Sequence, residues 1–107
     1  MSELQKENEV IQIDLSKDMN EGVLAQFGAQ VEHAMKMMFA DTPLGAEIRG
    51  TAQQIKSFLR TLGNEKRYLD IFNRAGLGNG ETYKSKYRLD QSVREFETST
   101  GVKWPFK

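Results

Sequence analysis

Hydrophobic and polar residues alternate in the first part of the chain that carries a regular pattern. Ile11, Ile13 and Leu15 are separated by Gln12 and Asp14, and a period of two is typical of a short, half-buried strand. A single strand is marginal in water, and no obvious mate for it is seen in the sequence. We therefore expect an extended arm packed on helices; pairing with a partner's sheet edge or with a second copy is the alternative.

The pattern becomes helical at about Met19 and stays helical to about Ala40. The apolar positions step by fours and then by three, and so share one broad arc of a helix; they are Met19, Val23, Phe27, Val31, Met35 and Met38. Thr42-Pro43 then has the composition of a helix cap followed by proline at the first helical position.

A second helix is predicted from about Leu44 to Leu62, because the apolar residues of this segment fall within about 120° when each residue turns by about 100°. Beyond Gly63-Asn64 the apolar positions rotate by roughly 90° relative to this stripe. Glycine as a helix stop and asparagine as an N-cap provide a mechanism for a break, so we predict a turn there. A third helix then runs to Gly76.

A fourth helix is predicted from about Tyr83 or Lys86 to Thr100, where Gly101 ends it. The predicted fold class is all-α, a compact bundle of about four unequal helices with a short extended N-terminal arm and an extended C-terminal tail. The polar residues 1–9 are expected to form a flexible tail, and residues 10–107 a single α-helical domain.

The composition is that of an ordinary globular domain. The 107 residues are 38% hydrophobic and 28% charged, and a chain of this length has room for one core. The absence of cysteine excludes disulfides, thiolate metal sites and cysteine nucleophiles. The single histidine excludes ligation of a metal by two histidines of one chain. No apolar run approaches a membrane span and no secretory signal is evident, so we expect a cytoplasmic protein without metal, cofactor or membrane contact.

The net charge is zero, but acidic and basic residues are unevenly distributed along the chain. Fifteen basic and fifteen acidic residues give a net charge of zero, but residues 1–47 hold three basic and nine acidic side chains, whereas residues 48–107 hold twelve and six. The simplest interpretation is that the halves face each other or carry different solvated faces. The alternatives are a basic surface for an acidic partner or nucleic acid, and head-to-tail self-association.

Catalysis has little support in the sequence. His33 has no serine, carboxylate or second histidine at a spacing that indicates a triad or a metal site. The glycine-rich segment 76–80 lacks the preceding strand and the spacing of a phosphate-binding loop, and is interpreted as a connector. We therefore expect a non-enzymatic protein.

A small interaction module, acting as an adaptor, regulator or assembly component, is the preferred functional hypothesis. It rests on the lack of a catalytic constellation, on the divided charge, and on apolar residues at both ends of the chain. A terminal Trp and Phe either cover the protein's own core or anchor it in a partner or a second copy. The candidate partner-binding residues are Val102, Trp104, Phe106 and Met37.

A nucleic-acid-binding accessory protein is the alternative. Cations set the affinity for phosphates, and exposed tyrosines can stack on bases. The candidate residues for nucleic acid or another acidic partner all lie in the second half of the chain; they are Arg49, Lys56, Arg60, Lys66, Arg67, Arg74, Tyr83, Lys84, Lys86, Tyr87 and Arg88. The competing interpretation is a solvated face that pairs with Glu32, Asp41 or Glu47 of the acidic half.

Overall fold

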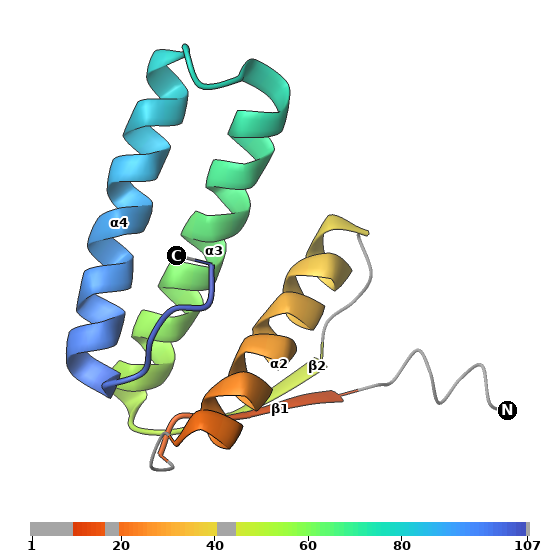
Figure 1. Cartoon of the computed structure of the whole chain (residues 1–107), viewed down its shortest axis with the longest axis vertical. Coiled ribbons are helices and arrows are strands. Elements are labelled where there is room, and N and C mark those ends of the chain that lie inside the picture. Colours follow the sequence, from red (N-terminus) through yellow and green to blue (C-terminus); the bar gives the residue numbers. More distant parts are fainter. Residues whose placement is uncertain (1–9, 17–19, 41–44, 107) are drawn as a thin grey trace, which may run out of the picture.

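A computed structural model describes residues 10–16, 20–40 and 45–106. The structure is mostly helical (72%), with three helices and a two-stranded sheet (Figure 1). The elements follow in the order β1 (Val10–Asp14), α2 (Glu21–Phe39), β2 (Gly45–Arg49), α3 (Ala52–Ala75) and α4 (Gly80–Thr100). The predicted flexible tail at residues 1–9 and the predicted cap at Thr42-Pro43 lie outside the described residues.

The N-terminal arm is a strand of a sheet, which corrects the expectation of an isolated extended segment. β1 pairs in parallel with β2, with Ile11 opposite Ala46 and Ile13 opposite Ile48. Parallel neighbours need a long crossover, and α2 provides it. The side chains of Ile11 and Ile13 are buried, as the alternating pattern predicted. The second strand was missed because Ile48 is its one apolar residue that is even partly buried.

The helix predicted to begin at about Leu44 begins instead at Ala52. Thr51 caps it: its Oγ1 accepts a hydrogen bond from the Gln54 backbone N–H, and the Gln54 side chain accepts one from the Thr51 N–H. Such a capping box marks a helix start. Gly50 joins strand and helix with φ of +156°, where a Cβ would lie 2.8 Å from Gln54 Oε1. The helical spacing of Ile48 with the residues after Ala52 was therefore accidental.

The turn predicted at Gly63-Asn64 is also wrong, because α3 continues through both residues. Before this point the buried Phe58 and Leu62 belong to the main core. After it, Tyr68 stacks on Phe72 at a ring separation of 6.0 Å. The apolar stripe rotates because the two halves of α3 pack against different neighbours. The helix itself is unbroken.

The fourth predicted helix exists but starts earlier than expected. Asn79 is its N-cap and accepts a hydrogen bond from the Glu81 backbone N–H, so α4 begins at Gly80. It ends at Thr100 with Gly101 in the left-handed conformation, as predicted. The merging of two predicted helices into α3 leaves three helices in the described part of the chain.

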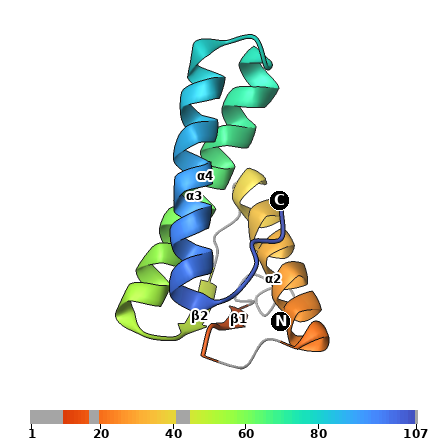
Figure 2. The ribbon, with the colours of Figure 1, turned by 60° about the vertical axis from the view of Figure 1, so that its left-hand side comes forward.

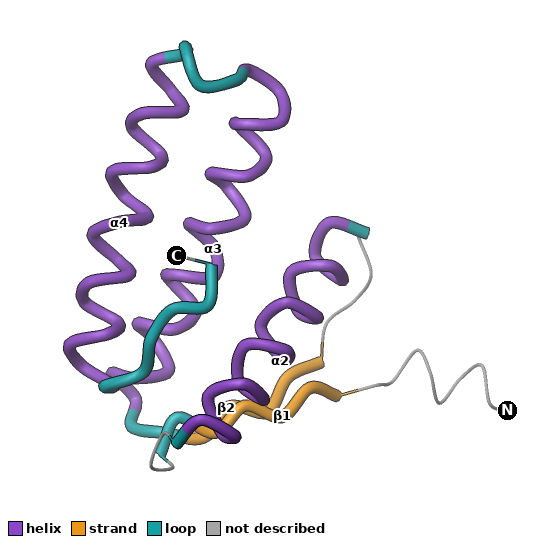
Figure 3. Tube along the Cα trace, in the orientation of Figure 1, coloured by secondary structure: helices purple, strands orange, loops and turns teal. Residues whose placement is uncertain are grey.

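The helices α3 and α4 form a long antiparallel hairpin, and α2 lies against one side of it (Figures 1 and 2). The small sheet lies near the open end of the hairpin, and the part of the hairpin nearest the α3–α4 turn extends beyond α2 (Figure 3). The core joins all of these elements. Its buried members are Ile11, Ile13, Leu15, Phe27, Val31, Ala34, Met35, Phe58, Leu62, Leu89, Val93, Phe96, Val102 and Trp104.

The C-terminal tail belongs to this core. Val102 and Trp104 are 1% and 3% exposed, and the Trp104 ring lies 5.4 Å from that of Phe96 and 6.0 Å from that of Phe58. The Trp104 indole Nε1–H donates to Glu65 Oε1 at 2.8 Å. A buried tryptophan that both packs and satisfies its polar atom is a strong anchor for a terminal segment.

Truncating Trp104 should therefore lower stability far more than truncating its exposed neighbour. We expect Trp104→Ala to cost about 3–5 kcal/mol of unfolding free energy, because it removes a large buried ring. Phe106→Ala should cost about 1 kcal/mol, because Phe106 is 38% exposed. Urea unfolding of the two variants beside the wild type measures the difference, and equal losses would contradict the packing described here.

Glu65 is a carboxylate buried beside the tail. Its pKa is raised above the ordinary value of 4.5, first because burial disfavours the charged form; the hydrogen bond from Trp104 and the positive charge of Lys86 oppose the shift, while Asp90 adds to it. The folded state therefore holds this proton more tightly than the unfolded state. The stability that results is fully present below the unfolded pKa and is lost as pH rises through the raised pKa.

Glu65→Gln tests this dependence. Glutamine keeps an oxygen that accepts from the Trp104 indole but does not ionise. We expect the variant to gain stability relative to the wild type as pH rises above about 4.5, and the difference to become constant once the wild-type carboxyl is fully ionised. Unfolding free energies measured from acidic to neutral pH provide the test, and a difference independent of pH would refute it.

Candidate nucleic-acid interface

Five of the predicted basic residues line one groove between α3 and α4. The groove has a volume of about 590 Å³. Its lining residues are Gly63, Lys66, Arg67, Asp70, Ile71, Arg74, Glu81, Lys84, Ser85 and Arg88. We call it the basic groove. Lys66, Arg67 and Arg74 come from α3, and Lys84 and Arg88 from α4, so both helices contribute cations to it.

Most of the basic groove lies on the side of α3 that faces away from α2; Lys66, at its edge, lies over the Phe39 ring of α2, 5.2 Å from the ring centroid. Arg67 is nine residues beyond the buried Phe58, which at about 100° per residue places it on the opposite side of the helix. Phe58 packs edge-on against Phe27 of α2, with ring centroids 6.0 Å apart. The helix α2 covers the other side of the hairpin (Figure 2), and none of its residues lines the groove.

Positive charge in the groove is only partly neutralised. Lys66 Nζ lies 2.8 Å from Asp70 Oδ2, so this pair is internally balanced. Arg67, Arg74, Lys84 and Arg88 are exposed, and none of them forms an ion pair with a carboxylate within the described residues. The groove thus presents four unpaired cations against one other carboxylate, that of Glu81.

The acidic first half does not supply the missing partners. Glu32 pairs with Lys36 of its own helix, with Nζ and Oε1 3.6 Å apart. Glu47 lies exposed on β2, and Asp41 lies outside the described residues. The pairing of the basic face with these carboxylates, which the divided charge allowed, is absent from the described part of the chain.

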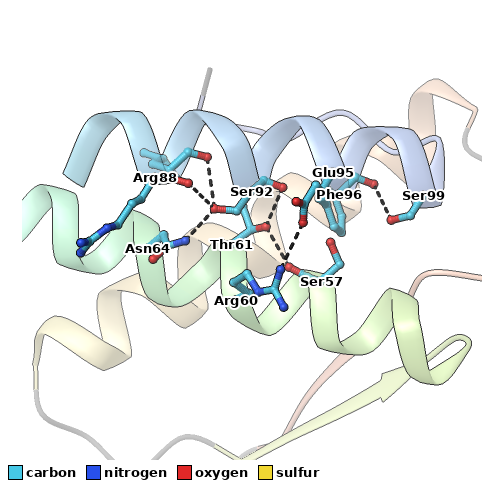
Figure 4. A network of polar contacts seen from close by, with 10 residues as sticks. Ser57, Arg60, Thr61, Asn64, Arg88, Ser92, Glu95, Phe96 and Ser99 are labelled. Carbon is cyan, nitrogen blue, oxygen red and sulfur yellow. Dashed lines mark hydrogen bonds and ion pairs between the residues drawn. The ribbon is translucent and has the colours of Figure 1, made fainter. Parts of the chain in front are cut away.

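A polar seam joins the two helices beneath this face (Figure 4). Thr61 Oγ1 donates to the backbone oxygens of Ser57 and Ser92 at 2.8 and 3.2 Å, and Asn64 Nδ2 donates to Ser92 Oγ at 2.6 Å. Thr61 and Ser92 are buried. Small hydroxyl side chains occupy little volume, and their hydrogen bonds satisfy them in the interface. The seam therefore joins the two helices next to the end of the groove that is nearer the chain ends of the hairpin.

Toward the chain ends of the hairpin the open face is also basic, with three cations and one carboxylate around its cavity. A second cavity of about 770 Å³ there is lined by Lys56, Arg60, Arg94 and Glu95, among others. Arg60 Nη1 lies 3.1 Å from Glu95 Oε2, an ion pair that bridges the two helices (Figure 4). Lys56 and Arg60 were predicted members of the basic surface, and they lie on the same face as the basic groove but outside it.

The remaining predicted basic and aromatic residues are dispersed. Arg49 lies on β2 rather than on a helix, which corrects its predicted position. Lys86 lies over the Tyr68 ring, 5.7 Å from its centroid, and pairs with Asp90. Tyr83 and Tyr87 are exposed on α4, at 69% and 64%.

The candidate partner-binding residues are mostly used by the fold. Val102 and Trp104 are buried in the core, which is the first of the two alternatives that the sequence left open for the tail; their binding of a partner stays a prediction. Met37 is half-buried against the core, and Phe106 packs its ring 6.2 Å from that of Trp104. The described residues leave no apolar anchor at the C-terminal end comparable to a free tryptophan.

Two features of the site were missed in the sequence. Gly63, interpreted as a helix stop, instead lines the basic groove. The polar seam was overlooked because its members are small and hydrophilic. Their spacing carries a signal all the same: Ser57, Thr61 and Asn64 step by four and three, the spacing of a helix that packs along a partner helix.

The comparisons with protein-family models, with curated proteins and with solved structures gave no match. Within the described residues, none of the helices has the length and apolar character to cross a membrane. The same part of the chain holds no group of three or more His, Asp or Glu side chains placed to bind a metal ion. The chemistry that the basic groove offers is the binding of anions.

Proposed function

We propose that this chain is a non-enzymatic, nucleic-acid-binding accessory protein that holds the phosphate backbone in the basic groove. The observation that carries the proposal is the set of four unpaired, exposed cations, Arg67, Arg74, Lys84 and Arg88, on a face that no other described element covers. Phosphate contacts supply most of the affinity in such complexes. We also propose that it acts in the cytoplasm, on composition alone.

The charge of the projecting part of the hairpin supports this assignment. Residues 66–88 contain six basic and two acidic side chains. This segment includes the turn between α3 and α4, the part of the hairpin that extends beyond α2 (Figure 3). A protruding element with a net positive charge attracts polyanions and is accessible to them.

The interaction-module hypothesis stays a prediction with less to support it. It drew on apolar residues at both chain ends, and the structure places Ile11, Ile13, Val102 and Trp104 in the core. An acidic protein surface is the competing occupant of the basic groove. The binding experiment below separates it from nucleic acid.

Charge reversal inside the groove should weaken binding and reduce its salt dependence, whereas the same change elsewhere should not. Four phosphate contacts predict a slope of log K against log salt of about −2.8 on a single strand, or roughly 50-fold weaker binding at about 200 mM than at about 50 mM salt. Arg67→Glu combined with Arg88→Glu should make this slope shallower, with a magnitude of about 1.4 or smaller. Fluorescence anisotropy with labelled DNA and RNA measures both quantities.

The matched control is Arg49→Glu combined with Lys103→Glu. It changes the net charge by the same amount at two exposed positions outside the groove. We expect its affinity and slope to stay close to those of the wild type. Equal losses of affinity in the two double variants would show that binding depends on net charge alone, and would contradict the basic groove as the binding site. No binding of any nucleic acid by the wild type would refute the proposal and favour an acidic protein partner.

A further inference from the structure

We infer that the basic groove takes a single strand of nucleic acid, lying lengthwise between α3 and α4, rather than a duplex. This inference rests on the proposed function and names the occupant of the same site. It is carried by the concave shape of the groove, by the glycine that lines it and by Tyr87 at its edge.

The first argument is shape. Proteins that read duplex DNA insert a convex element, a helix or a pair of strands, into its major groove. Here Arg67 and Arg74 on one side and Lys84 and Arg88 on the other line a concavity between two packed helices, whose axes in such packing are about 8–10 Å apart. A single flexible strand can follow a cationic groove of this kind with its backbone. A duplex would rest across the two helices that border the groove instead of entering it.

The second argument is Gly63. It lies in the interior of α3, where glycine is a poorer helix former than alanine. Its φ is not positive, unlike those of Gly50, Gly76 and Gly101. A Cβ at Gly63 would meet no atom within 4 Å. Neither backbone conformation nor crowding explains the residue, whereas its position on the groove wall does: a side chain longer than a methyl group would project into the space that the occupant needs.

The third argument is the position of two exposed tyrosines. Neither Tyr83 nor Tyr87 lines the basic groove: each precedes a groove cation by one residue and so lies about 100° from it around the helix. Lys84 and Tyr87 are three residues apart and therefore neighbours on the surface of α4. Bases of a single strand are unpaired and free to stack on such rings, whereas those of a duplex are already stacked on each other. The Tyr87 ring thus lies beside one phosphate-binding cation at the edge of the groove, whereas Tyr83 lies farther around α4.

The experiment compares Gly63→Leu with Gly63→Ala. Both replacements favour the helix over glycine, so both proteins are expected to fold, which thermal unfolding checks. The probes are a labelled oligothymidylate of about 12 nucleotides, within the site sizes of single-strand-binding folds, and a duplex of the same length, at equal salt. We expect the wild type to prefer the single strand by roughly tenfold or more.

Gly63→Leu should weaken single-strand binding by roughly tenfold, while Gly63→Ala should stay within about twofold of the wild type. Equal or tighter binding of the duplex, or identical effects of the two variants on the single strand, would overturn the inference while leaving the proposed function in place. Absence of binding to both probes would overturn the inference together with the proposed function.

Discussion

The aromatic cluster of Phe27, Phe58, Phe96 and Trp104 is the contact on which the rest of the structure depends. It joins α2, both arms of the hairpin and the C-terminal tail, and its members are 5% exposed or less. Ring centroids within it lie 5.4 to 6.0 Å apart, the range of favourable aromatic packing. The cluster places α2 and the tail on one side of the hairpin. The other side is thereby left open.

The open side of the hairpin has a different chemistry. Hydroxyl side chains such as those of Thr61 and Ser92 join α3 to α4 there, and cations border the groove above them. Four like charges in one groove repel each other and contribute nothing to folding. Their accumulation on this face is the feature from which we propose a nucleic-acid partner, whose phosphate backbone would neutralise them.

The alternating segment around Ile13 and the helices α2 and α4 were recognisable in the sequence, because each has its own period or cap. The strand β2 was not, because a five-residue strand with one partly buried apolar side chain carries almost no periodic signal. Gly63-Asn64 misled because the same residue types end and begin helices elsewhere. Only the packing of both halves of α3 along α4 shows that the helix passes through them.

For the candidate site, too, some features follow from the sequence and others only from the tertiary structure. The excess of basic residues in the second half, and the identity of Arg67, Arg74, Lys84 and Arg88 as candidates, follow from the sequence alone. Their gathering in one groove depends on the antiparallel pairing of two helices, which brings residues far apart in the chain to facing walls. Local patterns determine which residues a segment presents. Which of those surfaces is covered is decided by long-range packing, and here the burial of Trp104 and the openness of the basic groove were both decided at that level.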